Sequence, residues 1–474
     1  MTPVKPICCL RSAATASAVL VSLACVLPVR AQELRTWLTT PDRASLVSQQ
    51  HNIRFRSVPA PHSLIQIDDS ITYQTIDGFG HAVTGGTAQL MMKMSAGARH
   101  RLLEELFGDR RGQRNISYIR ISVGASDMNE SVYTYDDVPD GSTDPTLSHF
   151  SLAPDDVYLV PVLKEILAIH PGIRILASPW TPPSWMKDND KPKGGTLLPE
   201  DYPVYAEYLV KYLQGMAERG IRITTMTVQN EPENPKNTPS MVLTAEQEAR
   251  FIGEYLGPAV AKAGLHTEIL AFDHNCDHPQ YPITVLSDPL AGKYTGGSAF
   301  HLYAGEITAL TTVHDAFPSK DIFFTEQLVL PRRGSTDLGI AEPVARVVIG
   351  ASTNWARNVL LWNLAADPQD GPHTNDGGCT VCAGAITLDG DKVTRNLAYY
   401  VTAHFTQFVP PGSTRIAAAA EGVDLPHVAY RFPNGEHVLV VSNTSAESAD
   451  FSIGYKGKFA EVTLPAGAVA TYQW

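Results

Sequence analysis

The stretch Ile221-Arg222-Ile223-Thr224-Thr225-Met226-Thr227-Val228-Gln229-Asn230-Glu231-Pro232 combines an apolar run with an abrupt polar end. Apart from Arg222, residues 221–228 are apolar or β-branched, which predicts a mostly buried β-strand. The run stops at Asn230-Glu231-Pro232, because proline has no N–H with which to continue a hydrogen-bond ladder. Glu231 therefore lies at the carboxyl end of a strand, where a parallel α/β barrel carries its reactive side chains.

A second predicted strand ends in the same way, over Asp321-Ile322-Phe323-Phe324-Thr325-Glu326. Two carboxyl groups on two strand ends can divide acid–base work. One donates a proton to a leaving oxygen, and the other stays ionised to attack or to stabilise positive charge. We therefore take Glu231 and Glu326 as candidate catalytic residues. The alternative is that each is a loop carboxylate or a partner of a helix N-terminus.

Short apolar runs alternate with helical stretches from residue 76 onwards, which is the pattern of βα units. Helix punctuation supports this pattern: Ser95 precedes and Gly108 follows one helix, and Thr244 with Gln247 forms a capping box. Eight such units predict an α/β fold of the (β/α)8 TIM-barrel type. The predicted strands are residues 76–80, 118–123, 173–178, 224–229, 268–273, 297–303, 321–326 and 358–363.

The helical pattern stops after Phe408-Val409-Pro410-Pro411-Gly412, and short strands separated by turn residues follow. These predicted strands are residues 427–431, 437–442, 451–455, 461–464 and 468–474. Residues 63–73 also alternate, so we expect both chain ends to form one side-attached β-sandwich. The predicted domains are residues 1–31 as a signal peptide, 32–75 plus 409–474 as the β-sandwich, and 76–408 as the catalytic barrel.

The first 31 residues have the composition of a secretory signal peptide. Lys5 and Arg11 form the charged start, residues 13–29 form the apolar segment, and Val29-Arg30-Ala31 offers a cleavage site. The alternative is an uncleaved anchor, although the segment is short for a membrane span. We expect a secreted or periplasmic protein whose mature chain has no stable membrane insertion.

Loss of residues 1–31 would remove three cations and no acid, which moves the formal net charge from −12 to −15. An acidic surface argues against nucleic acid and anionic membranes as partners, because both are themselves negatively charged. Neutral ligands such as sugars are compatible with this charge.

Three of the six cysteines would leave with the signal peptide, and the mature chain keeps Cys276, Cys379 and Cys382. In an oxidising compartment we expect Cys379 and Cys382 to form a disulfide, with a redox or zinc role as the alternative. Cys276 is then left as a buried thiol.

The run His274-Asn275-Cys276-Asp277-His278 alternates residues that can bind metals. No further ligand is identifiable in the sequence, so we expect no metal site.

Polar and aromatic residues also fall at the ends of the predicted barrel strands. Pyranose rings present apolar faces and hydroxyl edges, so aromatic rings with carboxylate, amide and guanidinium partners suit them. The candidate substrate-binding residues at these ends are Arg120, Asp127, Trp180, Asn230, His301, Tyr303 and Trp362. As alternatives, Trp180 or Trp362 belongs to the core, and Arg120 belongs to a structural ion pair.

Several separate motifs resemble glycoside hydrolase family 30 and occur in that family's order. They are Asp77-Gly78-Phe79-Gly80, Tyr133-Thr134-Tyr135-Asp136-Asp137, residues 178–186, Asn230-Glu231-Pro232, the strand with His301 and Tyr303, and Phe324-Thr325-Glu326. The resemblance spans about residues 37–474 and implies a retaining mechanism on a barrel with a side-attached β-sandwich. It also implies Glu231 as acid/base and Glu326 as nucleophile. The positions that it implies around the terminal sugar are Asp127, Trp180, Asn230 and Trp362.

Two departures from the resemblance concern the part of the substrate beyond that sugar. Thr84-Gly85-Gly86 stands where lysosomal glucosylceramidases have Thr-Asp, and the loop 378–382 resembles bacterial members and β-1,6-glucanases.

We expect a secreted retaining β-glycosidase that hydrolyses β-glucosidic bonds by double displacement and resembles glucosylceramidases. The alternatives are an endo-β-1,6-glucanase, a β-xylanase and, in another class, a non-hydrolytic carbohydrate-binding protein. The predicted mechanism needs no cofactor, and the negative charge of Glu326 keeps Glu231 protonated.

Overall fold

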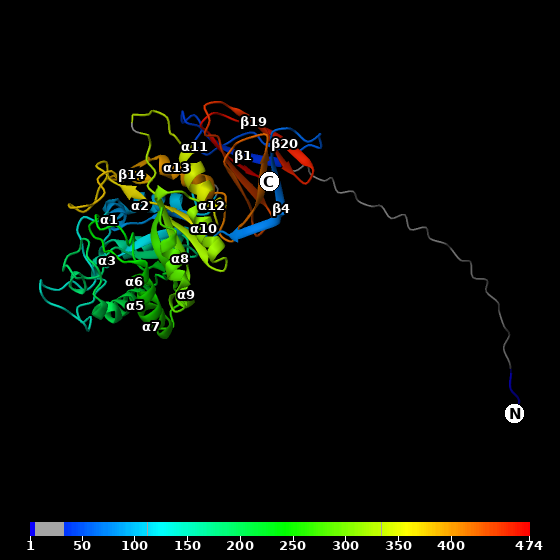
Figure 1. The fold of residues 1–474 in the computed structure, drawn as a ribbon. Coiled ribbons are helices and arrows are strands. Elements are labelled where there is room, and N and C mark those ends of the chain that lie inside the picture. The colour runs from blue at the N-terminus through cyan, green and yellow to red at the C-terminus, as the bar shows by residue number, and fades with distance from the viewer. Residues whose placement is uncertain (5–32, 111, 333) are drawn as a thin grey trace.

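The computed structural model describes residues 1–4, 33–110, 112–332 and 334–474, and it contains a closed barrel beside a β-sandwich (Figure 1). The predicted signal peptide, residues 1–31, lies outside the described residues except for its first four positions. The predicted fold class, a (β/α)8 barrel with a β-sandwich built from both chain ends, is confirmed. Among the described residues, none of the helices combines the length and the apolar character that a membrane span requires.

Eight parallel strands close the barrel in the order β10-β11-β12-β5-β6-β7-β8-β9. Their bounds are β5 Gly78–Ala82, β6 Tyr118–Val123, β7 Arg174–Pro179, β8 Thr225–Thr227, β9 Glu268–Cys276, β10 Thr295–Gly305, β11 Asp321–Glu326 and β12 Ala356–Leu361. Each predicted barrel strand overlaps one of them. The largest shortfall is in β8, which covers three residues of the predicted 224–229. The chain nevertheless stays beside β7, because the Asn230 N–H donates to the Pro179 carbonyl at 2.7 Å.

The barrel interior is filled by buried side chains from six different strands. They are Tyr118, Leu176, Leu270, Ala299, Phe323 and Leu360. Because side chains alternate along a strand, the residues two positions further on also face the interior, nearer the carboxyl ends. These include Arg120, Ser178 and Thr325. An apolar floor therefore supports a layer of polar side chains.

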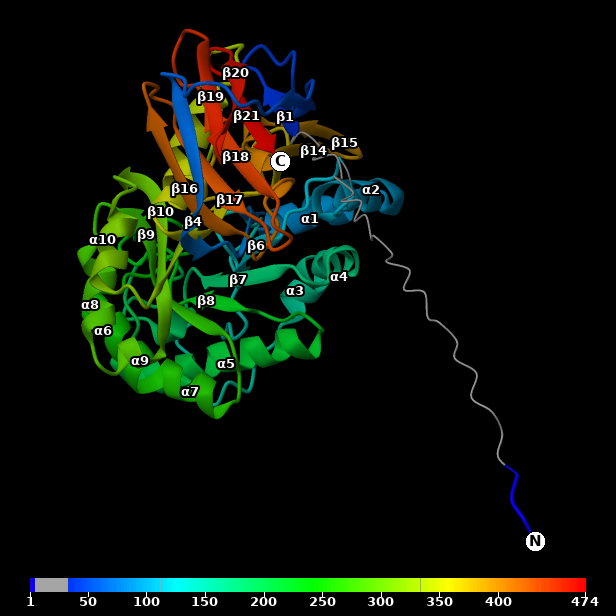
Figure 2. The same cartoon turned by 90° about the vertical axis from the view of Figure 1, so that its right-hand side faces the viewer.

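Helices and short helical turns cover the outside of the barrel (Figure 2). The α-helices are α1 Gly85–Lys93, α2 Ala96–Phe107, α3 Ala153–Val157, α4 Leu159–Ile169, α5 Tyr202–Glu218, α6 Ala245–Arg250, α7 Gly257–Lys262, α8 Gln280–Ser287, α9 Ala291–Tyr294, α10 Ala309–Ala316, α11 Ala341–Pro343, α12 Gly350–Thr353 and α13 Leu397–Thr406. The other turns are η1 Ser184–Met186 and η2 Pro199–Asp201, which are 3-10 helices, and η3 Phe251–Leu256 and η4 Val344–Ile349, which are π-helices. The predicted caps are confirmed, because Ser95 accepts from the Ala98 N–H and Thr244 with Gln247 forms a complete capping box.

The sandwich strands come from both ends of the chain and lie to one side of the barrel (Figure 2). Their order is β2-β1-β21-β18-β17-β16-β4-β19-β20, and β3 pairs with β1. Since β4 pairs with both β16 and β19, the two chain ends are hydrogen-bonded into one unit. The bounds are β1 Glu33–Thr39, β2 Ser48–Gln49, β3 Ile53–Arg54, β4 Leu64–Thr75, β16 Thr414–Glu421, β17 His427–Arg431, β18 His437–Ser442, β19 Ala449–Tyr455, β20 Lys458–Leu464 and β21 Val469–Gln473.

A third, small sheet was not expected from the sequence. It consists of β13 Ala365–Ala366, β14 Ile386–Asp389 and β15 Lys392–Arg395. Its strands are too short to show an alternating pattern, and the pairing of β13 with β14 joins segments that are distant along the chain. The sheet holds the two ends of the loop between residues 366 and 386, which carries both predicted disulfide cysteines.

Candidate active site

Asp273 is the centre of the polar layer, at the end of the predicted strand 268–273. Its fully buried carboxylate contacts the side chains of Arg120, Ser178, Thr227, His301 and Thr325. Burial opposes its ionisation, but the Arg120 guanidinium and the His301 imidazole hold the pKa of Asp273 well below its usual range. Asp273 is absent from the predicted site residues, although its place at a strand end is the same signal that points to Glu231.

Arg120 is fully buried in the polar layer and does not line the open pocket. Its guanidinium donates to the carboxylates of Asp273 and Glu326 and, at 2.7 Å, to Asn230 Oδ1. It also lies 4.9 Å from the centre of the Trp180 ring. The structure therefore favours the ion-pair alternative for Arg120. Its effect on a ligand is indirect, because it orients the carboxylate and the amide that do line the pocket.

Glu326 is the last residue of β11 and presents its carboxylate between two donors. Arg120 Nη1 binds one oxygen, and the Tyr303 hydroxyl donates to the other at 2.9 Å. The same hydroxyl accepts from the Leu328 backbone N–H at 3.0 Å, so the phenol is held from both sides. Burial raises the pKa of Glu326, and the positive charges of His301 and Arg120 oppose that effect.

Glu231 follows the last residue of β8, Thr227, by four positions and has a left-handed backbone conformation, with φ 45°. Non-glycine residues adopt this region rarely, and such strain is often stored at functional sites. The conformation is held by the Glu231 N–H, which donates to the Asp273 carbonyl at 3.0 Å. Asn234 Nδ2 donates to one carboxylate oxygen at 2.7 Å, and the other oxygen lies 3.1 Å from His301 Nδ1.

His301 lies on β10, fully buried among three carboxylates. Its Nδ1 is 3.1 Å from Glu231 and 4.0 Å from Glu326, and its Nε2 is 3.1 Å from Asp273. Burial would lower the pKa of His301, but the negative charges of Glu326 and Asp273 and the contact with Glu231 raise it to about 9. The ring does not line the pocket, so the predicted contact of His301 with substrate is replaced by contacts with the site's own carboxylates.

The protonation state of Glu231 differs from the expectation. Burial favours its neutral form, but the hydrogen bond and the positive charge of His301 lower the pKa of Glu231 to about 2. The expectation that Glu326 keeps Glu231 protonated is therefore wrong, because the adjacent imidazolium has the stronger effect. The proton is held by His301 instead.

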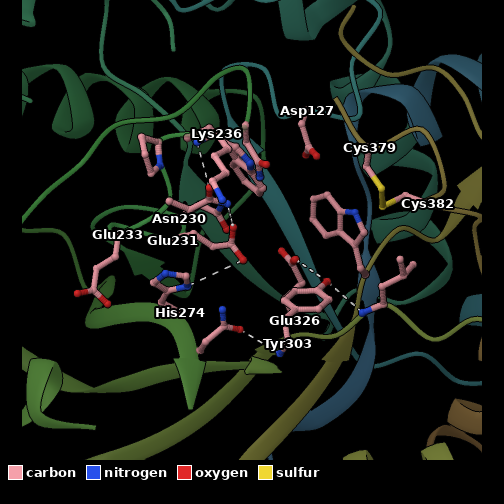
Figure 3. A pocket seen from close by; sticks show the side chains of 17 residues that line it. Asp127, Asn230, Glu231, Glu233, Lys236, His274, Tyr303, Glu326, Cys379 and Cys382 are labelled. Carbon is pink, nitrogen blue, oxygen red and sulfur yellow. Dashed lines mark hydrogen bonds and ion pairs between the residues drawn. A yellow bond between two sulfur atoms is a disulfide. The ribbon is translucent and has the colours of Figure 1, made fainter. Parts of the chain in front are cut away.

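The two glutamates open into a cavity of about 440 Å³ at the carboxyl end of the barrel (Figure 3). The predicted residues that line it with them are Asp127, Trp180, Asn230, Tyr303 and Trp362. The centroids of the Trp180 and Trp362 rings lie 5.7 Å apart, and both residues line the cavity. Burial, together with the charges of Glu326 and Glu231, raises the pKa of Asp127 to about 8. At neutral pH this carboxyl group is therefore mostly protonated, and it can donate as well as accept a hydrogen bond.

The cavity mouth, which we define as the cavity-lining residues 233–237 with His274 and Asn275, contains side chains that are absent from the predicted site. The loop after β8 contributes Glu233, Asn234, Pro235, Lys236 and Asn237. Figure 3 shows Glu233 and His274 on the side of Glu231 away from Asp127. These residues could have been predicted from their position in the sequence, because the loops that follow barrel strands form the binding surface.

Cys379 and Cys382 form a disulfide that lines the same cavity (Figure 3). Their Cα atoms are 5.5 Å apart. The predicted disulfide between these two cysteines is therefore present in the structure. Cys276 is a buried thiol whose Sγ donates to the His301 carbonyl at 3.2 Å.

Two family models match this chain. The model of the glycosyl hydrolase family 30 TIM-barrel domain matches residues 76–409, and that of the family 30 β-sandwich domain matches residues 412–472. Together they cover the barrel and most of the sandwich described above. The resemblance inferred from the sequence motifs is confirmed.

Individual relatives include more than one kind of glycosidase. An endo-1,6-beta-D-glucanase of Aspergillus fumigatus is 34% identical over 435 residues, which cover 86% of this chain and 87% of the relative. The lysosomal acid glucosylceramidase of Mus musculus is 32% identical over 440 residues, which cover 87% of this chain and 83% of the relative. A solved structure of an endo-beta1,6-glucanase matches with a TM-score of 0.86 and 34% identity, over 93% of this chain and 99% of that one. The chain therefore belongs to glycosyl hydrolase family 30, and it is a retaining glycoside hydrolase rather than a non-hydrolytic carbohydrate-binding protein.

Proposed function

We propose that this glycoside hydrolase cleaves β-1,6-linked glucan in an endo manner, in preference to glucosylceramide. The observation that carries the proposal is the polar character of the cavity mouth, where Glu233, Lys236 and Asn275 offer charged and amide groups. A neighbouring glucose unit presents hydroxyl groups that such side chains can hydrogen-bond, whereas the apolar chains of ceramide need an apolar surface. The endo-1,6-β-glucanases among the relatives support the same choice.

Glu326 is the nucleophile in this proposal. Its carboxylate attacks the anomeric carbon, the bond from that carbon to the glycosidic oxygen breaks, and a glycosyl ester forms on Glu326. The hydrogen bonds from Arg120 and Tyr303 fix the carboxylate before substrate arrives. This preorganisation lowers the entropy cost of reaching the attack geometry.

Glu231 acts first as acid and then as base, and His301 stores the proton that it donates. As ester formation removes the charge of Glu326, His301 loses the strongest attraction that raises its pKa. While the glycosidic bond breaks, the proton moves across the 3.1 Å contact to Glu231 and on to the leaving oxygen. In the second step, Glu231 accepts a proton from the water that attacks the ester. The sugar is released, Glu326 becomes ionised again, and the proton returns to His301.

The sugar at the cleaved bond lies between the aromatic side of the cavity and Asn230. Asn230 Oδ1 already accepts from Arg120, so its NH2 group is available to donate to the 2-hydroxyl, a contact that strengthens in the transition state. Trp180 and Trp362 cover the apolar part of the ring, and protonated Asp127 binds a hydroxyl edge.

We also propose that the enzyme acts outside the cytoplasm, either secreted or periplasmic. This proposal rests on the composition of residues 1–31 and on the size of a polymeric substrate. The exported protein should have a new N-terminus immediately after Ala31, which N-terminal sequencing can detect. Full-length protein confined to the cytoplasm would contradict it.

Parallel assays on a soluble β-1,6-glucan and on detergent-dispersed glucosylceramide test the substrate. We expect rapid release of oligosaccharides of several lengths from the glucan and a much lower kcat/KM for glucosylceramide, with xylan as a control that stays uncleaved. Release of glucose alone would indicate exo action and contradict the endo assignment. A higher kcat/KM for glucosylceramide would reject the proposed substrate.

A further inference from the structure

We infer that Glu231, His274 and His301 form a binding site for one divalent transition-metal ion, such as Zn²⁺, and that the bound ion inhibits the enzyme. One ligand atom from each residue lies within 4.8 Å of the others, and all three residues are buried. Imidazole nitrogen and carboxylate oxygen are the ligands that zinc prefers besides thiolate. The inference concerns an inhibitor of the site, because the proposed reaction itself uses no metal.

The spacing of these atoms is close to that of a zinc site. With bonds of about 2.1 Å, neighbouring ligand atoms of a tetrahedral site are about 3.4 Å apart. The Glu231–His301 contact is 3.1 Å and the Glu231–His274 contact is 4.0 Å. The second distance exceeds the ideal spacing by about 0.6 Å, so ion binding requires His274 to move closer to Glu231. Glu231 and His274 both line the cavity, so water from the cavity can supply a further ligand.

His274 has an unsatisfied nitrogen within this cluster. Its Nδ1 is buried and has no hydrogen-bond partner among the described residues. The contact with Glu231, drawn as a dashed line in Figure 3, is too long for a hydrogen bond. Because an unpaired buried polar atom costs free energy, an ion that bridges His274 and Glu231 would stabilise this arrangement.

The groups behind the ligands are arranged as they are in zinc sites. His301 Nε2 lies 3.1 Å from Asp273 Oδ1, which is the carboxylate–imidazole pair that typically orients a metal-binding histidine. Asn234 holds the second oxygen of Glu231 at 2.7 Å. Three carboxylates, those of Glu231, Asp273 and Glu326, surround His301, and a single guanidinium offsets them. Once the His301 proton is displaced, the remaining negative charge therefore attracts a cation.

Metal binding and catalysis would use the same atom, Glu231 Oε1. An ion bound there displaces the proton between Glu231 and His301 and blocks protonation of the leaving oxygen. The expected inhibition therefore rests on the proposed role of Glu231, whereas the binding of the ion does not. This difference allows the two claims to fail separately.

Isothermal titration calorimetry of the chelator-treated full chain with ZnCl2 tests the binding. We expect one site per chain and a dissociation constant that rises about tenfold or more in His274→Gln. His278→Gln is the matched control, because His278 is an exposed imidazole paired with Glu233 outside the cluster. The affinity of this control should match the wild type. An unchanged affinity in a folded His274→Gln variant would overturn the inference.

Co²⁺ provides a readout on the wild type alone. It should give the visible absorption of a tetrahedral complex, which Zn²⁺ abolishes by competition. The absence of such absorption, or of saturable Zn²⁺ binding, would overturn the site whatever the behaviour of the variants.

Inhibition is measured on an aryl β-glucoside with and without EDTA. Inhibition that EDTA reverses and that weakens in His274→Gln supports both the site and the role of Glu231. His274-dependent Zn²⁺ binding without inhibition would overturn the inhibition and count against Glu231 as acid/base. Normal hydrolysis without any Zn²⁺ binding would overturn the metal site and leave the proposed function intact.

Discussion

His301 Nδ1 lies 3.1 Å from Glu231 Oε1, and this contact holds the Glu231 carboxylate in its ionised form. The other nitrogen of the ring contacts Asp273, so the acid/base candidate is tied to the buried centre of the polar layer. The protons of the site therefore belong to a coupled cluster rather than to single residues. Substitutions at Glu326, Glu231, Asp273 and His301 should then have effects that measurement can tell apart.

Glu326→Ala should reduce the turnover of all substrates by on the order of 10⁴–10⁶-fold, because no nucleophile remains. Azide fits the space left by the carboxylate and should restore turnover with inverted product, which NMR identifies as an α-glycosyl azide. Glu233→Ala, which removes a carboxylate from the cavity mouth, should retain hydrolysis of an aryl β-glucoside. Rescue that yields a β-configured azide would contradict the assignment.

Glu231→Ala should slow substrates with poor leaving groups by on the order of 10²–10⁴-fold. Aryl β-glucosides of acidic phenols should lose much less, because their leaving groups need no proton. The measurement is kcat/KM against the pKa of the phenol, which should depend more steeply on leaving group in the variant than in the wild type. An equal loss on every leaving group would show that Glu231 is not the acid.

Asp273→Asn should lower the free energy of unfolding by about 3–5 kcal/mol, because Arg120 and His301 lose their buried charge partner. Guanidinium denaturation monitored by fluorescence measures this change. Asp277→Asn, an exposed carboxylate on the following loop, is the control and should change stability by at most about 0.5 kcal/mol. Equal stability of the two variants would disprove the structural role of Asp273.

The pH dependence of stability should report the protonation of His301. Its pKa is about 9 in the folded protein against an ordinary value of 6.5, so the folded chain holds a proton that the unfolded chain has lost. This contribution is complete below pH 6.5 and is lost as pH rises to about 9, by up to about 1.4 kcal/mol per pH unit. Unfolding free energies across this window should fall more steeply for the wild type than for His301→Gln. Parallel curves would mean that His301 is neutral in the folded site.

Cys379→Ser should raise KM and shift the melting temperature only slightly. A disulfide that closes so short a loop contributes on the order of 2 kcal/mol or less through chain entropy. Its position at the cavity next to Trp362 makes the local effect on substrate binding the larger one. Cys382→Ser should behave identically. Mass spectrometry that finds both thiols free in the exported protein, or a large fall in melting temperature with unchanged KM, would contradict this.

The barrel strands and the two glutamates were predictable because their signals are local. Residues 221–228 and 321–324 are dominated by apolar and β-branched side chains, and Pro232 ends the first of these runs. A parallel barrel then places every strand end on one face, so the proximity of Glu231 and Glu326 follows from the fold class. The cavity-lining positions of Asp127, Trp180, Asn230, Tyr303 and Trp362 were predictable in the same way.

The contacts of Asp273, His301 and Arg120 could not be predicted from local sequence patterns. Their types and strand positions are visible in the sequence, but burial and pairing depend on which strand ends meet across the barrel. The small sheet of β13, β14 and β15 was missed because its strands are very short and because the pairing of β13 with β14 joins segments on either side of a long loop.

The amino-acid sequence by itself determined the barrel, the sandwich built from both chain ends, and the strand-end positions of Glu231 and Glu326, because side-chain periodicity and chain-breaking residues act over a few neighbours. Only the tertiary structure decided which group holds the proton. The charge of His301, whose ring is fully buried, depends on the carboxylates of Glu231, Asp273 and Glu326, which approach it from three other segments of the barrel. Electrostatic energies depend on distance and burial in three dimensions, and a linear sequence contains neither.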